Sequence, residues 1–301
     1  MERLELRNTS IGRGGFGVVK LAELTLLDPS PTSKITVAIK DLQENRQGVI
    51  GRRVAYRLVR EMAVWSSFRH ENILKFIGYH LTRDVSVAFL VSPYFANGNV
   101  RDYLRTTPTT LEKKLELVRD TACGLEYLHT RGPPVVHGDL KALNVLVTDD
   151  RNAVLCDFGL TIVLQDGPTG LTTAEGFRGT IRWCSLEVLL GERRSSTSDV
   201  WSWGCLVMEI IAGIEPYRGV GNENAIALFM ERDRATPGRV DHDSEIKPHR
   251  LLRLVRECWD FNVQQRPNAS ECMSRVNATI RMEQSLKKVT NRLFSSSTRW
   301  G

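Results

Sequence analysis

The sequence predicts an α+β fold in two parts: a small β-rich N-terminal part with one main helix, and a larger, mostly helical C-terminal part. Short segments rich in β-branched residues dominate up to residue 94, and helical patterns dominate after it. Between them, the turn-forming run Ala96-Asn-Gly-Asn99 marks the boundary. We therefore expect domains at residues 1–94 and 95–283, followed by a basic tail at residues 284–301.

Five strands are expected in the N-terminal part. Residues 4–6 alternate between apolar and charged side chains, residues 18–21 follow a glycine cluster, and residues 35–39 are rich in β-branched side chains. Two further strand-like segments lie near residues 73–79 and 85–92. Together these segments predict one small sheet.

A helix is expected between the third and fourth strands, because Val54, Leu58, Met62 and Trp65 recur at helical spacing. Glu61 lies three residues after Leu58 and four before Trp65, so its carboxylate shares their inward side. The helix therefore points one carboxylate towards the strands.

Helical patterns organise the C-terminal part. An amphipathic stripe between residues 111 and 125 predicts one helix, and residues 199–212 are apolar nearly all round, which predicts a buried helix at the core. Between these helices, short strands at residues 135–136, 145–147 and 154–156 are joined by polar turns. Candidate catalytic residues collect in those turns.

The composition argues against several classes of protein. The longest strongly apolar stretch, residues 204–213, is too short to cross a bilayer, and Glu209 interrupts it. The first ten residues lack the apolar core of a secretory signal, the six cysteines form no C-x-x-C pair, and the six histidines show no metal-ligand spacing. We expect a cytoplasmic or nuclear protein with free thiols, no membrane span and no zinc site.

The net charge of +6 is modest, and the basic residues are dispersed among acidic ones except around residues 46–60 and in the tail. The chain shows no signature of a nucleic-acid-binding module. A solvated surface explains the charge, so no nucleic-acid partner is expected.

A glycine cluster, Gly12-Arg-Gly14-Gly-Phe-Gly17-Val-Val19, allows the backbone to approach phosphate oxygens closely. A dinucleotide-binding motif of this type would open a helix, yet residues 18–22 are typical of a strand. The pattern therefore favours a strand-turn-strand flap over a phosphate. A glycine-rich hairpin without any ligand is the alternative at this point.

Lys40 ends the apolar strand Val37-Ala-Ile-Lys40. An ammonium beside a core is costly unless it meets anions, and Glu61 and nucleotide phosphates are the natural candidates. Glu44 and Glu71 are alternatives to Glu61.

Four motifs in order now resemble the signature set of eukaryotic protein kinases: the glycine loop, V-A-I-K, His137-Gly-Asp139-Leu-Lys141-Ala-Leu-Asn144 and Asp157-Phe-Gly159. The resemblance extends from Leu4 to about Met282. It implies a two-lobed protein-kinase-like fold that binds ATP and Mg²⁺ in the cleft and phosphorylates a protein substrate.

The resemblance assigns catalytic roles to four residues. Asp139 is the catalytic base, Lys141 steadies the transferring phosphoryl group, and Lys40 binds the α- and β-phosphates while Glu61 holds it in place. Asn144 and Asp157 are the implied Mg²⁺ ligands, and their oxygen chemistry suits a hard cation.

The implied nucleotide contacts come from the glycine loop, the strands and the hinge between the lobes. Ser92 is the gatekeeper, and Pro93, which has no backbone N–H, would offer its carbonyl while Phe95 offers its N–H. The full set of implied ATP-binding residues is Gly12, Gly14, Gly17, Val19, Ala38, Lys40, Ser92, Pro93, Phe95 and Leu146.

The same resemblance predicts two structural features. Trp65, Phe76, His137 and Phe158 are expected to form a packed column between the lobes. Glu187 and Arg266 are expected to form a buried ion pair, although the usual Ala-Pro-Glu motif is Ser185-Leu-Glu187 in this chain.

The motifs also bear on specificity and regulation. Lys141 and Thr180, with segments such as residues 199–204, resemble the tyrosine-kinase-like branch and point to serine/threonine specificity; tyrosine or dual specificity stays an alternative. Gly138 stands where most family members carry an arginine that pairs with a phosphorylated activation loop. We therefore expect constitutive or partner-regulated activity.

Two other functions compete with the protein-kinase interpretation. A pseudokinase scaffold would keep the fold and lose phosphoryl transfer, but this chain retains every catalytic residue named above. A small-molecule kinase of related fold is disfavoured because residues 180–187 and the later helices resemble a peptide-binding lobe. The sequence does not indicate an oligomeric state or a regulator.

Overall fold

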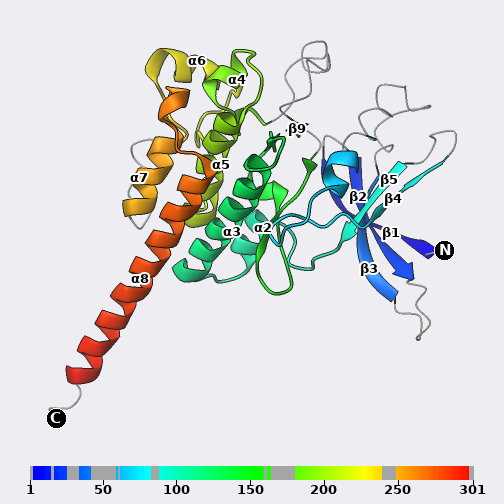
Figure 1. Cartoon of the computed structure of the whole chain (residues 1–301), viewed down its shortest axis with the longest axis horizontal. Helices are drawn as coiled ribbons and strands as arrows, with labels where there is room; N and C mark the ends of the chain where they lie inside the picture. The colour runs from blue at the N-terminus through cyan, green and yellow to red at the C-terminus, as the bar shows by residue number, and fades with distance from the viewer. Residues whose placement is uncertain are drawn as a thin grey trace. The chain divides into compact units, whose positions relative to one another are not determined.

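The computed structural model describes residues 3–14, 17–25, 34–41, 59, 62–82, 88–158, 161–163, 180–238 and 249–297. The chain divides into two compact units, Met1–Ala96 and Asn97–Gly301. The first unit is built around a β-sheet and the second is mostly helical (Figure 1). The predicted α+β, two-lobed fold class is therefore confirmed.

The first unit contains one antiparallel sheet with the strand order β1-β2-β3-β5-β4. The strands are β1 (Arg3–Gly14), β2 (Gly17–Thr25), β3 (Lys34–Asp41), β4 (Gly78–Leu81) and β5 (Ala88–Pro93). Their β-branched and aliphatic residues fit a pleated, half-buried surface.

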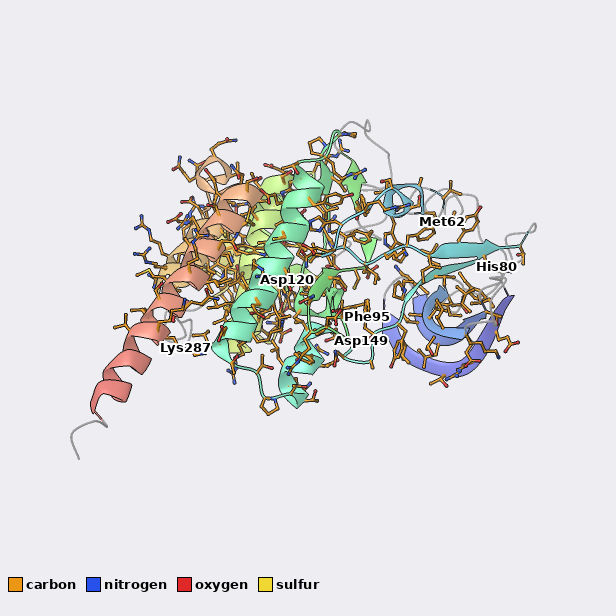
Figure 2. All side chains as sticks on the ribbon, turned by 60° about the horizontal axis from the view of Figure 1, so that its bottom comes forward. Met62, His80, Phe95, Asp120, Asp149 and Lys287 are labelled. Atoms are coloured by element: carbon orange, nitrogen blue, oxygen red, sulfur yellow. The ribbon has the colours of Figure 1, made fainter. Side chains whose placement is uncertain are left out.

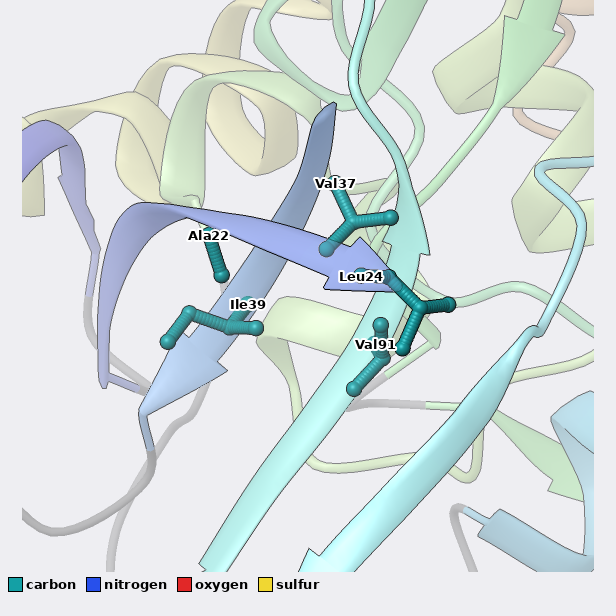
Figure 3. Packing of buried hydrophobic residues seen from close by; sticks show 5 residues of the cluster. All are labelled: Ala22, Leu24, Val37, Ile39 and Val91. Atoms are coloured by element: carbon teal, nitrogen blue, oxygen red, sulfur yellow. The ribbon is translucent and has the colours of Figure 1, made fainter. Parts of the chain in front are cut away.

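One face of this sheet carries a small apolar core. Successive side chains on a strand point to opposite faces, so residues two apart lie on the same side. Figure 3 shows the resulting cluster, which consists of Ala22, Leu24, Val37, Ile39 and Val91. All five are buried.

The structure corrects one strand and describes part of the expected helix. Residues 62–66 are helical. The strand expected near residues 73–79 starts only at Gly78. Ile73 and Leu74 are both buried instead of alternating, and the Leu74 carbonyl accepts a hydrogen bond from Trp65 Nε1 at 2.6 Å. Because that carbonyl is engaged by a side chain, it is not part of the sheet ladder.

The second unit contains the helices α2 to α8 and the short strands β6 to β9. Its α-helices are α2 (Val100–Thr106), α3 (Leu111–His129), α4 (Leu186–Leu189), α5 (Ser196–Ala212), α6 (Asn224–Asp233), α7 (His249–Cys258) and α8 (Ala269–Ser297). Short 3₁₀ helices are η1 (Ala142–Asn144), η3 (Ile181–Trp183) and η5 (Val263–Gln265). The strands β6 (Val135–Val136) and β9 (Ile162–Val163) pair with each other, as do β7 (Val145–Val147) and β8 (Ala153–Leu155).

Helix α5 is the centre of this unit, as its apolar sequence predicts. It starts at a capping box between Ser195 and Ser198 and ends at Gly213, whose φ of 69° is easily adopted by glycine. Trp201 and Trp203 are fully buried on it. Helices α3 and α7 pack against α5, and α3 also packs along α8. Among the described residues, none of the helices combines the length and apolarity needed to span a membrane.

Helix α8 continues through residues 284–297, where the sequence predicts a basic tail. These residues include no glycine or proline, so nothing in the segment breaks the helical hydrogen-bond ladder. Lys287, labelled in Figure 2, lies 2.8 Å from the carboxylate of Glu112 at the start of α3. The extended helix therefore keeps a contact with the helical unit beyond residue 283.

The predicted ion pair between Glu187 and Arg266 is confirmed. Two guanidinium nitrogens of Arg266 bind the two Glu187 oxygens at 2.6 and 3.0 Å. The guanidinium also donates to the carbonyls of Asp260 and Thr197 and stacks on the Trp201 ring. Burial alone would raise the pKa of Glu187, but the hydrogen bonds and charge of Arg266 hold that pKa below its ordinary value.

Removal of the Arg266 guanidinium should lower stability strongly, because the Arg266 side chain has 0% exposure. The Glu187 carboxylate would then stay in the interior without its counter-charge. We expect Arg266→Ala to lower the free energy of unfolding by ~3–5 kcal/mol in urea denaturation. Arg253→Ala, which breaks the exposed pair with Glu257 on α7, is the control and should cost less than ~1 kcal/mol. Equal losses in the two variants would show that the buried pair is not a structural anchor.

Candidate active site

Several predicted nucleotide-binding residues share one face of the N-terminal sheet. Across the strands, Val19 pairs with Lys40, and Ala38 pairs with Ser92. Because Ala38 and Lys40 are two residues apart on β3, all four side chains lie on the same face, opposite the apolar cluster. The sheet register therefore brings Val19, Ala38, Lys40 and Ser92 together.

The glycine cluster forms the hairpin between β1 and β2. The two strands are antiparallel, with Gly14 opposite Gly17 and Gly12 opposite Val19. This arrangement confirms the strand-turn-strand interpretation over the strand-turn-helix of a dinucleotide site. Gly12 consequently lies beside the face that carries Lys40.

The chain leaves this sheet through the predicted hinge. Pro93 ends β5 opposite Val37, where the ladder no longer needs its missing N–H. Phe95, labelled in Figure 2, follows two residues later and is partly buried. Ser92 is buried, with 7% exposure.

The partner predicted for Lys40 lies outside the described residues, because neither Glu61 nor its alternative Glu44 is among them. The other alternative, Glu71, is exposed in a turn after the helical residues 62–66.

In the helical unit, Asp139 is the centre of a compact polar cluster. Its Oδ2 accepts hydrogen bonds from Lys141 Nζ at 2.6 Å and from Asn144 Nδ2 at 2.8 Å. Its Oδ1 accepts one from the Thr180 hydroxyl at 3.2 Å, and that hydroxyl accepts from Lys141 Nζ at 2.6 Å. Two other side chains from the predicted catalytic and metal-binding set, Lys141 and Asn144, thus meet at the buried carboxylate of Asp139.

The other predicted metal ligand, Asp157, is placed close to Asn144 by the β7–β8 hairpin. The turn closes through a hydrogen bond from Thr148 N to the Asn152 carbonyl, and Cys156 N then donates to the Asn144 carbonyl at 3.0 Å. Asp157 follows Cys156 directly and has a φ of 64°, a left-handed conformation that is strained for a residue other than glycine. Backbone strain of this kind is frequent at functional sites.

The donor chemistry of these two residues fits Mg²⁺. Asn144 uses its amide nitrogen to bind Asp139, which leaves its amide oxygen as an acceptor, and Asp157 supplies a carboxylate. Mg²⁺ is commonly held by one or two such oxygens together with water and phosphate. Within the part of the chain that the structure describes, no group of three His, Cys, Asp or Glu residues forms a protein-only metal cage.

The rings predicted to form a column make one contact within each unit. Trp65 and Phe76 pack edge to face with ring centroids 5.1 Å apart, and His137 packs on Phe158 at 5.3 Å. Leu146, one of the implied ATP-binding residues, is on β7 and forms an isolated β-bridge with Asn99. The Cys156 thiol, just before Asp157, is buried, as is typical of an inert structural cysteine.

Asp199, at the start of α5, anchors the loop that carries Asp139. Its carboxylate accepts the backbone N–H groups of His137 and Gly138 at 2.7 and 2.8 Å and also contacts His129 Nε2 at 2.9 Å. Asp199 is 1% exposed. Sequence patterns assign Asp199 no role, and the only signal is a charged residue at the start of an otherwise apolar helical segment.

A second anchor for the same loop was also missed. Glu209, further along α5, accepts hydrogen bonds from Ala142 N at 2.9 Å and from Trp183 Nε1 at 2.7 Å. Glu209 interrupts an apolar run in the sequence, but its partners Ala142 and Trp183 lie 67 and 26 positions away in the chain.

Gly138, which replaces the usual arginine, has a φ of 82° that glycine adopts without strain. The guanidinium of Arg194 donates to the Gly138 carbonyl at 3.0 Å. An arginine from another segment therefore contacts the catalytic loop at this position.

Comparison with known proteins agrees with this geometry. A family described as protein tyrosine and serine/threonine kinase matches residues 6–276. Similar proteins include human ephrin type-A receptor 8, 34% identical over 75% of this chain and 22% of its own length, and zebrafish (Danio rerio) ephrin type-A receptor 3, 32% identical over 93% of this chain and 27% of its own.

A putative serine/threonine-protein kinase/receptor, R831, of Acanthamoeba polyphaga mimivirus is 32% identical over 72% of this chain and 13% of its own length. The chain thus spans between about one eighth and about one quarter of these relatives. The family match covers most of the chain, and it includes the glycine hairpin, the Asp139 cluster and the Glu187–Arg266 pair. The chain belongs to the protein kinase family.

Proposed function

We propose that this chain transfers the γ-phosphoryl group of Mg-ATP to serine or threonine hydroxyls of protein substrates. The observation that carries the proposal is the contact of Asp139, Lys141, Asn144 and Thr180 in one network. A scaffold that had lost catalysis would have no need to keep a base, a cation and an amide oxygen so close together.

Asp139 would accept or orient the proton of the substrate hydroxyl. Its Oδ2 is fixed by Lys141 and Asn144, whereas Oδ1 has a single described contact, the Thr180 hydroxyl at 3.2 Å. A carboxylate oxygen has two lone pairs, so Oδ1 keeps acceptor capacity for an incoming hydroxyl. The fixed orientation of the carboxylate lowers the entropic cost of proton transfer.

Two lysine side chains would stabilise the negative charge of the phosphate groups. Lys141 lies beside Asp139 and would stabilise the transferring phosphoryl group, while Lys40 on β3 would bind phosphate oxygens of ATP. Mg²⁺, held by Asn144 and Asp157, would neutralise charge on the β- and γ-phosphates.

Serine/threonine specificity is the finer part of the proposal. The matched family includes kinases for both classes of hydroxyl. The link from Lys141 through Thr180 to Asp139 supports serine/threonine acceptors, because those two residues resemble the serine/threonine pattern within the family. Tyrosine or dual specificity is the alternative outcome of the test below.

The test uses purified protein, Mg²⁺, γ-labelled ATP and a generic protein acceptor, followed by phosphoamino-acid analysis. We expect label on serine and threonine with the wild type. Asp139→Asn should reduce transfer by about 10²–10⁴-fold, because the amide cannot accept the hydroxyl proton. Circular dichroism and ATP binding establish that the variant is folded.

Label on tyrosine would overturn the serine/threonine assignment while leaving the kinase assignment intact. No transfer by either folded, ATP-binding protein would favour a pseudokinase. Label only on a small-molecule acceptor would favour a small-molecule kinase of related fold.

Ser92 should determine access for inhibitors. It is small, buried and on the same sheet face as Lys40, so a larger side chain would fill the space behind the proposed adenine site. We expect Ser92→Met to raise the inhibitory concentration of bulky ATP-competitive compounds at least ~10-fold, which corresponds to about 1.4 kcal/mol of lost binding. Ser92→Ala, which adds no volume, should leave potency unchanged; equal potency against all three proteins would remove Ser92 from the gatekeeper role.

A further inference from the structure

Glu209 joins the two segments that meet at the proposed catalytic base. A single carboxylate oxygen, Oε2, accepts the backbone N–H of Ala142 and the indole N–H of Trp183. Ala142 directly follows Lys141, and Trp183 lies three residues after Thr180. Because Lys141 and Thr180 both contact Asp139, this one oxygen ties together both segments that shape its surroundings.

Both donors to Glu209 are neutral, in contrast to the guanidinium that faces Glu187. The charged and titratable groups around Glu209 are Arg101 on α2, Glu215 in the turn after α5, and the Cys205 thiol one helical turn earlier. Burial raises the pKa of Glu209 to about 7, Glu215 adds to the rise, and Trp183, Ala142 and Arg101 oppose it. The carboxyl group therefore changes charge near neutral pH.

We propose that ionised Glu209 is a positioning residue, which holds residues 142 and 183 in register so that Lys141 and Thr180 stay on Asp139, and that its protonation loosens this hold and lowers kinase activity. The inference rests on the proposed phosphoryl transfer. A carboxylate is a stronger hydrogen-bond acceptor than a carboxylic acid, since charge-assisted hydrogen bonds are roughly twice as strong as neutral ones. Activity should consequently rise with pH through about 7.

Ionisation of Glu209 should also lower the stability of the folded protein. The folded-state pKa of Glu209 is higher than the ordinary value of 4.5, so the folded protein binds more protons than the unfolded chain between these values. The contribution of Glu209 to stability is therefore greatest below about pH 4.5 and declines as pH rises towards 7. A buried carboxylate that lowers stability near neutral pH is expected at sites where its charge serves the function of the protein.

The test compares wild type with Glu209→Gln, which keeps the shape of the side chain but cannot ionise. At pH 8 we expect the variant to lose about tenfold in kcat, because its acceptor is neutral. At pH 6, where about nine tenths of wild-type Glu209 is protonated, the two proteins should differ less than about twofold. In parallel, the Tm of the variant relative to wild type should be higher at pH 8 than at pH 5. A merely structural contact would lower both activity and Tm at every pH.

A direct readout is independent of catalysis. In ¹⁵N-tryptophan-labelled protein, the indole N–H resonance of Trp183, assigned with Trp183→Phe, should titrate with a midpoint near 7 in wild type and not in Glu209→Gln. Glu215→Gln is the matched control. It removes a neighbouring exposed carboxylate and should keep the activity and the titration while shifting the midpoint to lower pH.

These outcomes separate the inference from the proposed function. If wild type transfers phosphate and both proteins share one pH profile, or if the Trp183 resonance does not titrate, Glu209 does not act through its charge. If the resonance titrates but no protein transfers phosphate, the proposed function fails and so does the catalytic part of this inference.

Discussion

The carboxylate of Asp199 is the contact on which the rest of the helical unit's site depends. The loop of His137 to Asn144 has little regular structure of its own, since only its last three residues form a 3₁₀ turn. Two of its backbone N–H groups donate hydrogen bonds to Asp199, which is part of α5, the most buried helix of the unit. Without this anchor, those buried N–H groups would lack partners and the first part of the loop would lose its hydrogen bonds to α5.

Further polar contacts connect this anchored loop to the other residues of the site. His137 contacts the Cys156 carbonyl and packs on Phe158, which connects the loop to the segment that carries Asp157. The side-chain Nδ2 of Asn144 then donates hydrogen bonds to both the backbone carbonyl and the carboxylate of Asp139. The proposed base and the proposed metal ligands are thus held by one continuous network, so displacement of any member is felt by the others.

Local sequence patterns predicted much of the fold. The glycine cluster followed by β-branched residues identified the β1–β2 hairpin, and the all-round apolar pattern identified α5. The strand expected near residues 73–79 starts only at Gly78, because the Leu74 carbonyl is engaged by Trp65 Nε1, and periodicity cannot report such a side-chain contact. Residues 284–297, expected as a basic tail, form the end of α8, and their lack of glycine and proline is itself a feature of the sequence.

In the candidate site as well, residues in local motifs could be predicted from the sequence, and residues that act over long sequence separations could not. The motif resemblance named Asp139, Lys141, Asn144 and Asp157, which need only a short stretch of chain to come together. The residues that position them, Asp199 and Glu209, lie 61 and 67 positions after the loop residues Gly138 and Ala142 that they bind. Their partners are backbone N–H groups, which every residue except proline possesses, so no side-chain pattern could identify the pairing.

Among the acidic residues that bring carboxylates into this unit's interior, Glu187, Asp199 and Glu209 are each satisfied differently. Glu187 meets a guanidinium through two hydrogen bonds, and Asp199 receives two backbone N–H groups and a histidine nitrogen. Glu209 receives only two neutral donors on one oxygen. A buried charge without a full counter-charge is the most easily neutralised by a proton. Glu209 is therefore the anchor whose strength depends on pH, and it touches both sides of the catalytic network.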